Sequence, residues 1–422
     1  MAMHRWGITL AVVAILLVLA GALFVTMRRP SLDKTSEALT VDTQSPALVP
    51  GSAGKMSAWI FTGEIPAAAW ERIIREFEKT SGYRVQLTVY DSEEKYRESL
   101  RVALAERRLP EVFLIESTEA EALKEAGQIV AVETVPTDAT EWVPGALATF
   151  QRGEKTLGFP SEFTLLALYY NTSSFDRVGV AYPDVHWTWE TLLGISQAIY
   201  RAPLNEQAEP LYSLELPLRF DVWQTFAAQA GGGLYAGSTW QVGAPNALAA
   251  QVKSLTYLRD FLKRYVIVPR PPSAVSGKLF VQGRASMAIA GAELLRELRS
   301  RPDLRWGVAP LPKDENRSTV VKARGWTVSA QCPSPKDAAR LARALATQPS
   351  RSSWLSAHVG AGTSHSPAEQ VFFDAAAYAQ PLPFIATSPE LERIINEELL
   401  RWINQDNPSP EAMIEWTQKL LK

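Results

Sequence analysis

Strand and helix patterns alternate, with short loops between them, over residues 58–115. Three segments have the apolar or alternating character of strands: Ala58–Phe61, Arg84–Tyr90 and Glu111–Ile115. Helical periodicity separates them, and Pro66 suits the first turn of the earlier helix because its missing N–H costs no hydrogen bond there. This order predicts a doubly wound α/β fold built on a mainly parallel sheet.

The loops after two of these strands carry polar residues. Thr62–Glu64 follow the first strand, and Glu116–Thr118 follow the third. In doubly wound sheets, ligands bind outside the carboxyl ends of the strands. We therefore expect both loops to contribute to a binding site.

The alternation continues through the rest of the chain. Thr188 stands where a hydroxyl can cap a helix N-terminus, and Gly231–Gly233 form a loop that a ligand can approach closely. We expect further strands at residues 155–160, 165–170, 286–290, 305–309 and 325–329, and further helices at 221–230, 246–265, 278–282, 292–300, 335–347, 389–404 and 410–421.

Composition removes several classes of function. The 43 basic and 45 acidic side chains give a formal net charge of −2, so no electrostatic feature favours nucleic-acid binding. One cysteine, Cys332, excludes an intrachain disulfide and a cysteine-rich zinc site, and we expect no cofactor and no metal. Thirteen tryptophans in 422 residues instead favour a large binder, since indole rings recur at binding surfaces.

The amino terminus contains a hydrophobic segment. Residues Ile8–Val25 are almost entirely apolar and are just long enough to cross a membrane as a helix. Two interpretations are open: an export signal cleaved after Ala22, or an anchor that keeps the whole run. Lipidation is not expected, because Ala22 stands where a cysteine would be needed. Residues 28–56, rich in Pro, Ser, Thr and Gly, predict a flexible linker.

Several short motifs occur in an order and spacing that one known family shares. They are Trp59–Glu64, Phe77–Lys79, Leu109–Phe113, Leu157–Pro160, Leu168–Asn171, Thr188–Glu190, Phe280–Met287, Gly307–Pro312 and Arg324–Trp326. With these motifs the chain resembles family 1 of the extracellular solute-binding proteins, the sugar-binding periplasmic proteins of ABC transporters. The resemblance covers roughly residues 57–400 and rests on the joint order of motifs that are individually weak.

The resemblance implies a two-lobed clamshell of type II-like topology, each lobe a mainly parallel sheet flanked by helices, with the ligand in the cleft between them. The chain would cross between lobes near Gly158, Pro312 and Gly360. The expected division is 1–27 as signal or anchor, 28–56 as linker, 57–157 and 312–363 as the first lobe, and 158–311 and 364–422 as the second. Hinge closure around the solute would then present a loaded, exported monomer to an ABC permease in the membrane.

Sugars combine hydroxyl groups with apolar C–H faces, so their sites pair carboxylates with aromatic rings. The resemblance and the strand-end rule together select these ligand-binding residues: Thr62, Gly63, Glu64, Glu116, Ser117, Glu162, Phe163, Trp223, Gly232, Gly233, Gly291, Glu293 and Trp326. Each has a structural alternative. Glu64 also suits the first turn of a helix, and Trp223 and Trp326 also suit a core.

Three positions depart from the family pattern. Glu111 stands where aspartate is usual, and Ala292–Glu293 occupy a stretch that often carries an aromatic residue. Arg324 stands where a second glycine is typical, so its side chain either enters the cleft or points away from it. These departures bear on the identity of the solute and leave the expected fold unchanged.

Three classes of function are compatible with these patterns. The leading one is a carbohydrate-binding subunit of an importer, with another polar solute as its nearest variant. A membrane-tethered sensor would use the same fold. An enzyme is not expected, because the chain has no nucleophile motif, metal-ligand spacing or phosphate loop, although Glu64 and Glu116 would be the carboxylates to consider for glycoside hydrolysis.

Overall fold

The computed structural model describes residues 39–41, 54–61, 67–133, 138–202, 212–236, 239–264, 276–349, 353–360, 365–382 and 389–421. The expected signal or anchor and most of the expected linker lie outside these residues. Two parts of the linker are strands: β1 is Leu39–Val41, and β2 (Gly54–Phe61) begins before the expected boundary. Within the described ranges, every helix is too short or too polar to cross a membrane.

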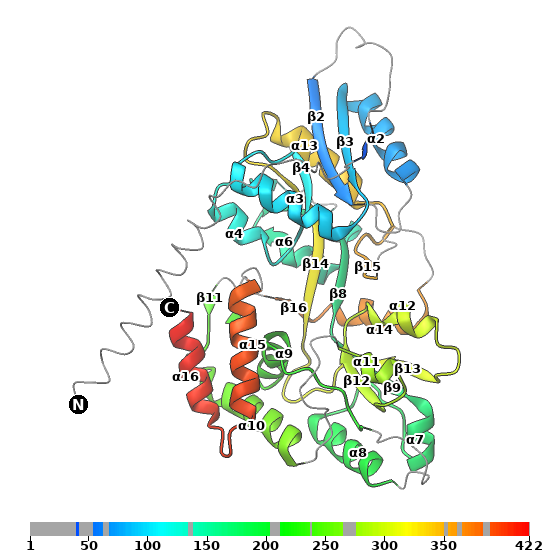
Figure 1. Ribbon diagram of the computed structural model, residues 1–422, viewed down its shortest axis with the longest axis vertical. Helices are drawn as coiled ribbons and strands as arrows, with labels where there is room; N and C mark the ends of the chain where they lie inside the picture. The colour runs from blue at the N-terminus through cyan, green and yellow to red at the C-terminus, as the bar shows by residue number, and fades with distance from the viewer. Residues whose placement is uncertain are drawn as a thin grey trace, which may run out of the picture. The chain divides into compact units, whose positions relative to one another are not determined.

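The larger sheet has the order β1-β3-β2-β4-β14-β8-β15, with β16 beside β14 (Figure 1). Its first part is parallel, since β2 pairs in parallel with β3 (Tyr83–Tyr90) and β4 (Val112–Glu116). β14 (Thr319–Val328) then runs antiparallel to both β4 and β8 (Phe159–Leu165). The sheet is therefore mixed, and the expected mainly parallel arrangement was wrong. The strand–helix–strand pattern of residues 58–115 predicts only the parallel pairing of β2, β3 and β4.

Helices on the larger sheet bury the apolar stripes that the sequence predicted. α2 (Ala67–Ser81) contacts β3 and α13 (Pro335–Ala346), and it buries Trp70, Ile74 and Phe77. α3 (Glu93–Glu106) begins after Ser92, whose side chain accepts a hydrogen bond from the backbone N–H of Lys95. We call the larger sheet and its helices the first lobe.

The smaller sheet has the order β12-β9-β13 and belongs to the second lobe. Its central strand, β9 (Ala167–Asn171), is antiparallel to β12 (Met287–Ala290) and to β13 (Trp306–Ala309). Single parallel bridges join Tyr212 to Ala285 and Glu215 to Ala288. The expectation of a mainly parallel second sheet was wrong, because these strands pair across long sequence separations that local periodicity does not encode.

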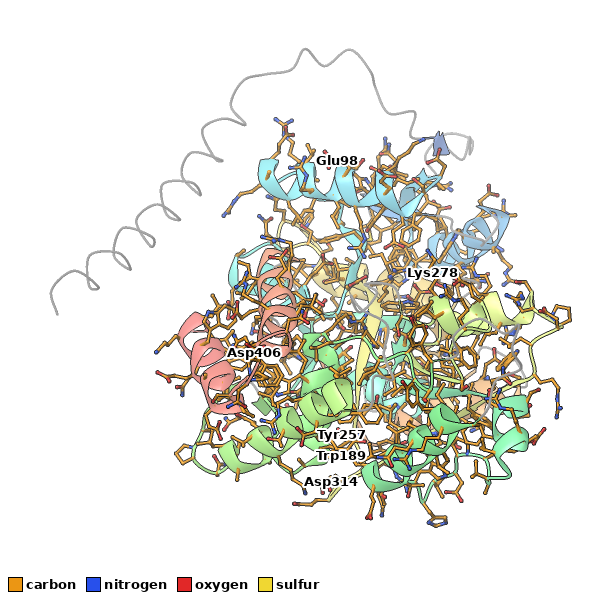
Figure 2. All side chains as sticks on the ribbon, turned by 60° about the horizontal axis from the view of Figure 1, so that its bottom comes forward. Glu98, Trp189, Tyr257, Lys278, Asp314 and Asp406 are labelled. Carbon is orange, nitrogen blue, oxygen red and sulfur yellow. The ribbon has the colours of Figure 1, made fainter. Side chains whose placement is uncertain are left out.

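Aromatic packing holds the helices of the second lobe together. Thr188 caps α8 (Trp189–Arg201) as predicted, with its side chain accepting from the backbone N–H of Thr191. Trp189 stacks on Tyr257 of α10 (Leu248–Arg264), with ring centroids 4.6 Å apart, and Figure 2 shows the two side by side. The indole Nε1 of Trp189 donates to Gln229 Oε1 at 2.6 Å, which satisfies its buried polar atom.

β8 and β14 are the strands that lead from one sheet to the other (Figure 1). The chain passes from β8 into β9 at Leu166 and returns from β13 to β14 over residues 310–318. The first crossing therefore comes after Leu165, later than the Gly158 expected, because β8 pairs with β14 from Phe159 to Leu165, with one register shift at Arg324/Gly325.

The remaining elements complete the two lobes. They are α4 (Ala120–Glu125), β5 (Val132–Glu133), α5 (Asp138–Glu141), α6 (Pro144–Phe150), β6 (Gln151–Arg152), β7 (Lys155–Thr156), α7 (Thr172–Val178), α9 (Phe220–Gln229), β10 (Tyr235–Ala236), β11 (Thr239–Trp240), α11 (Lys278–Val281), α12 (Leu294–Arg299), β15 (Leu355–Ser356), α14 (Pro367–Ala375), β16 (Ala379–Pro381), α15 (Pro389–Ile403) and α16 (Pro410–Leu420).

Candidate functional site

Four polar residues share one face of the two strands that join the lobes. Glu162 and Thr164 of β8 lie opposite Arg324 and Lys322 of β14 in the antiparallel register. Because alternate residues of a strand point to the same side, all four lie on one face, and we call them the polar strip. The strip lies where the larger sheet gives way to the smaller one, at the boundary between the lobes.

Arg324 organises the first-lobe end of the strip. Its guanidinium nitrogens lie 3.0 Å from Glu93 Oε1, 3.1 Å from Glu162 Oε1 and 3.6 Å from Glu116 Oε1. Its side chain is only 12% exposed, and the guanidinium carbon lies 4.4 Å from the ring centroid of Trp354. A planar cation is thus held among carboxylates from α3, β4 and β8 and against an aromatic face.

A second guanidinium lies beside the same carboxylates. Arg97 of α3 approaches Glu93 to 2.8 Å, Glu116 to 2.5 Å and Glu119 to 3.8 Å. Burial raises the pKa of Glu119 above its ordinary value, even though the backbone N–H of Glu116 favours its charged form. With Glu162 included, four carboxylates face two guanidiniums among the described residues, a formal charge of −2.

The strip reaches the second lobe at two places. Lys322 lies 3.8 Å from Asp221, a buried α9 residue that also pairs with Arg219 at 2.8 Å. Burial alone would raise the pKa of Asp221, but Arg219 and Lys322 outweigh it and lower that pKa to about 2. Thr164 Oγ1 donates to Glu293 Oε2 at 3.1 Å and accepts from the backbone N–H of Ala292 at 2.9 Å.

The strip therefore carries fixed hydrogen-bond donors and acceptors that contact charged groups of both lobes. Such an arrangement suits a polar solute that exchanges hydroxyl donors and acceptors with charged partners. Within the ranges that the structure describes, no three His, Cys, Asp or Glu side chains are grouped so that they could hold a metal ion.

The sequence pattern of bacterial extracellular solute-binding proteins matches residues 72–377. This chain belongs to that family. No curated protein matches its sequence. The family is extracytoplasmic, which agrees with the expected export of this solute-binding protein.

Solved structures share the fold of this solute-binding protein at low sequence identity. The substrate-binding protein of Listeria monocytogenes in complex with cycloalternan has 18% identity and a TM-score of 0.66, covering 87% of this chain and 98% of that one. The maltose complex from Staphylococcus aureus has 17% identity and a TM-score of 0.64, with 87% and 98% covered. UgpB of Mycobacterium tuberculosis in complex with glycerophosphocholine has 16% identity and a TM-score of 0.66, with the same coverage. These likenesses establish the mixed α/β, two-lobed fold.

Three of the expected site residues are carboxylates that lie in or beside the polar strip. Glu162 belongs to it, Glu116 contacts Arg324 from the end of β4, and Glu293 accepts from Thr164. The expected residues Thr62, Gly63 and Glu64 lie outside the described residues.

Four other expected residues have structural roles. Ser117 exchanges hydrogen bonds with the backbone of Ala323, its N–H donating at 2.8 Å and its Oγ accepting at 3.1 Å. Phe163, Trp223 and Trp326 have no more than 1% of their surface exposed. This burial agrees with the packing alternative for all three, and their contact with a solute stays a prediction.

The expected glycines also pack closely against protein. A Cβ at Gly232 would lie 2.5 Å from the carbonyl oxygen of Ala247, and one at Gly233 would lie 3.4 Å from Gln224 Nε2. The carbonyl of Gly291 accepts from Tyr169 at 2.7 Å. The backbone of Gly232 is therefore closely approached, but by the carbonyl group of Ala247, which directly precedes α10.

Sequence reasoning did not select several residues that build the site. Arg324 was noted only as a departure from the family, and Glu93, Thr164, Lys322 and Trp354 were not selected. A signal was present on β14, because Lys322 and Arg324 alternate with Val321, Ala323 and Gly325. Polar residues at alternate positions of an otherwise apolar strand indicate a face that meets other polar groups.

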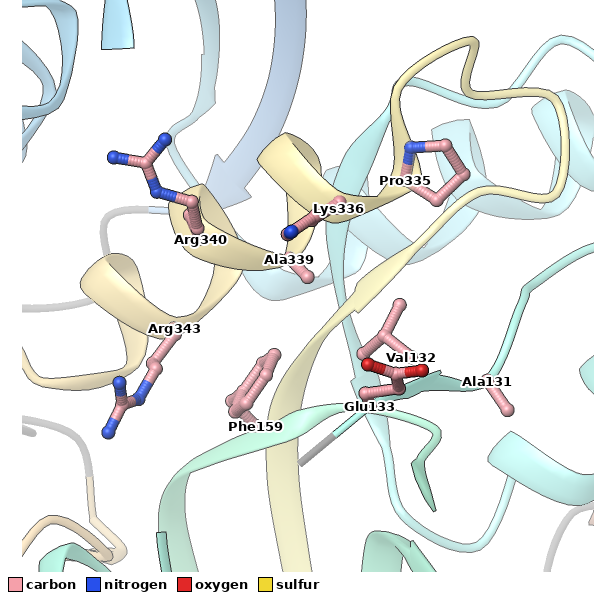
Figure 3. Close-up of a pocket in the computed structure, with 9 residues that line it drawn as sticks. All are labelled: Ala131, Val132, Glu133, Phe159, Pro335, Lys336, Ala339, Arg340 and Arg343. Atoms are coloured by element: carbon pink, nitrogen blue, oxygen red, sulfur yellow. The ribbon is translucent and has the colours of Figure 1, made fainter. Parts of the chain in front are cut away.

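A separate pocket of about 380 Å³ lies in the first lobe (Figure 3). Its walls are Ala131, Val132, Glu133, Phe159, Pro335, Lys336, Ala339, Arg340 and Arg343. Arg343 is held 2.6 Å from Glu141 and lies over the Trp142 ring at 5.4 Å. No residue of the polar strip lines this pocket, so the pocket and the strip are separate features.

Proposed function

We propose that the protein is the solute-binding subunit of an ABC importer and that it captures a mono- or oligosaccharide over the polar strip. The observation that carries the proposal is the strip itself, whose polar residues lie on the strands that join the lobes and contact charged groups of both. Carboxylates accept from sugar hydroxyls, guanidinium and ammonium groups donate to them, and the Trp354 ring suits a C–H face. Structures with the same fold carry cycloalternan and maltose, which supports this class of solute.

Capture would proceed by closure of the lobes and would involve no covalent chemistry. The polar strip already contacts Glu93 and Glu116 of the first lobe and Asp221 and Glu293 of the second. A solute that bonds to groups of both lobes stabilises the closed form over the open one, and a permease can distinguish the two. The protein is thus proposed to be a monomeric, non-enzymatic binder that delivers its solute to a membrane permease.

The amino terminus would place this binder outside the cytoplasm. Residues 8–25 are proposed either to direct export and be removed or to remain as an anchor. If they remain, a membrane-tethered sensor is the alternative use of the same clamshell. A second solute class is also kept, because UgpB, which shares the fold, was solved with glycerophosphocholine.

Isothermal titration of the purified full-length protein against a saccharide panel tests the proposal. Maltose, maltotetraose and a cyclic glucan are the first solutes, and glycerophosphocholine tests the second class. Small-angle scattering on the same samples is expected to show a smaller radius of gyration with the bound sugar. The carbohydrate assignment fails if no saccharide binds and none changes the scattering curve.

A matched pair of variants on α3 locates the site. Glu93→Gln removes a carboxylate that holds Arg324, and we expect sugar affinity to fall about tenfold or more, since hydrogen bonds to charged groups contribute about 1.5–3 kcal/mol. Glu98→Gln, labelled in Figure 2, removes an exposed carboxylate of the same helix whose contact is Arg101. Titration calorimetry should give wild-type affinity for Glu98→Gln. Equal effects of both substitutions would place the solute away from the strip.

A further inference from the structure

Arg324 occupies a set of contacts that ordinarily recognises a bound cation. Carboxylates of Glu93, Glu116 and Glu162 surround the guanidinium at 3.0, 3.6 and 3.1 Å. The Trp354 ring faces it at 4.4 Å, and the Phe61 ring lies at 5.9 Å. Carboxylates together with aromatic faces are the chemistry by which proteins hold organic cations.

The groups around Arg324 come from well-separated parts of the chain. Glu93 begins α3, Glu116 ends β4, Glu162 lies on β8, and Trp354 precedes β15. Glu162 is placed by the pairing of β8 with β14, and Arg97 also holds Glu93 and Glu116. Two of the three carboxylates are therefore held by more than Arg324, and we expect them to stay in place if the guanidinium is removed.

We infer that Arg324 is the chain's own occupant of a cation subsite at the first-lobe end of the polar strip and that it restricts the solute to uncharged molecules. The guanidinium already pairs with the three carboxylates and covers the Trp354 ring. A cationic solute therefore has no place in the subsite. An anionic solute meets a region of net negative charge. This inference rests on the proposed function for its account of the solute, but the existence of the subsite can be measured without any sugar.

Replacing Arg324 by alanine should open the subsite to a free cation of the same shape. Methylguanidinium is the probe because it carries the planar, charged end of the arginine side chain. The variant Arg324→Ala is expected to bind methylguanidinium with a dissociation constant in the millimolar range, and the midpoint of its thermal unfolding should rise by several degrees in about 10 mM probe. Wild-type protein should show neither effect at the same concentration.

Controls separate a specific subsite from general effects of salt. Sodium chloride at the same ionic strength and methylammonium, which lacks the planar group, should raise the unfolding midpoint of Arg324→Ala much less. Arg340→Ala removes an exposed arginine of α13 that contacts Asp337 and should bind no methylguanidinium. Adding Trp354→Ala to Arg324→Ala should weaken methylguanidinium binding severalfold, because the aromatic face is lost.

A second variant guards against misfolding of the first. Arg324→Gln keeps part of the side chain and an amide donor for the carboxylates, and it should show the same rescue by methylguanidinium. The inference is overturned if neither variant gains stability or binding with the probe, whether the variants are folded or not. It is also overturned if wild-type protein binds the probe as well as they do.

A separate binding experiment tests the class of solute, independently of the test for the cation subsite. Wild-type protein should bind a neutral sugar and reject its uronic acid and its amino-sugar counterpart by at least tenfold, and Arg324→Ala should gain affinity for the amino sugar. If methylguanidinium rescue succeeds but no sugar binds to any form, the subsite stands and the proposed carbohydrate function fails. If the uronic acid binds as tightly as the neutral sugar to wild-type protein, the restriction to uncharged solutes is wrong.

Discussion

Arg324 and Trp326 lie two residues apart on the same face of β14, yet they have different roles. Arg324 faces carboxylates and an aromatic ring, whereas Trp326 is buried and makes an edge contact with Trp70 at 5.6 Å. The sequence marks both residues as unusual, but it does not say which neighbours each will meet. Those neighbours come from α2, α3 and the segment before β15, whose approach depends on the whole fold.

Asp221 provides a test of charge at the scale of one residue. Its pKa falls from 3.8 to about 2 in the folded protein, so its contribution to stability is present above pH 3.8 and is lost as the pH falls through 2. This shift corresponds to about 2 kcal/mol. We expect Asp221→Asn to lower the free energy of unfolding by at least this amount near pH 6, and the difference from wild type to shrink as the pH falls from about 4 towards 2.

Denaturant unfolding at several pH values measures this difference. Asp303→Asn is the control, because Asp303 is an exposed residue whose side-chain contact is Arg301. A difference between wild type and Asp221→Asn that stays constant down to pH 2 would show that the lost stability is not electrostatic.

At the scale of elements, the sequence predicted most helices and strands where periodicity is local. α9, α10, α13, α15 and α16 agree with their expected positions to within two residues. β14 was expected only over 325–329, and β8 was expected to end near 160, because Glu162, Thr164, Lys322 and Arg324 interrupt the apolar pattern. The polar residues of the candidate site are therefore the reason that the full lengths of β8 and β14 were not predicted.

The junction between α9 and α10 gives a prediction at this scale. A Cβ at Gly232 would lie 2.5 Å from the Ala247 carbonyl oxygen and 2.6 Å from the Ala250 Cβ, so Gly232→Ala forces the two helices apart. We expect it to lower the free energy of unfolding by about 1–3 kcal/mol. Gly194→Ala in α8 meets no atom within 4 Å and should instead stabilise by about 0.5–1 kcal/mol. Chemical denaturation of both variants checks the contrast, and a neutral Gly232→Ala would show that the junction yields easily.

For the whole molecule, the two lobes share contacts made by β14 and are not independent bodies. β14 pairs with β4, β8 and β16 in the larger sheet and also contacts α9 of the second lobe. The sequence predicted two lobes through resemblance, but the antiparallel pairings in both sheets join segments far apart in the chain. No local pattern records such pairings, which is why the expected mainly parallel sheets were wrong.

This sharing predicts one cooperative transition on heating. Losing β14 would remove the centre of the larger sheet and the support of α9 together, so neither lobe should survive without the other. Scanning calorimetry of the unliganded protein should give one peak, with calorimetric and van't Hoff enthalpies in agreement. Two resolved peaks, each assigned to one lobe by tryptophan fluorescence and circular dichroism, would contradict it.

The position of β14 also has a consequence for biosynthesis. It lies between β4 and β8 in the larger sheet, yet it is synthesised only after the first 318 residues. Until then the growing chain lacks the strand that joins β4 to β8. We therefore expect the first lobe to stay incomplete and loosely structured until β14 is made, and a loosely structured chain is one that can still be threaded across a membrane.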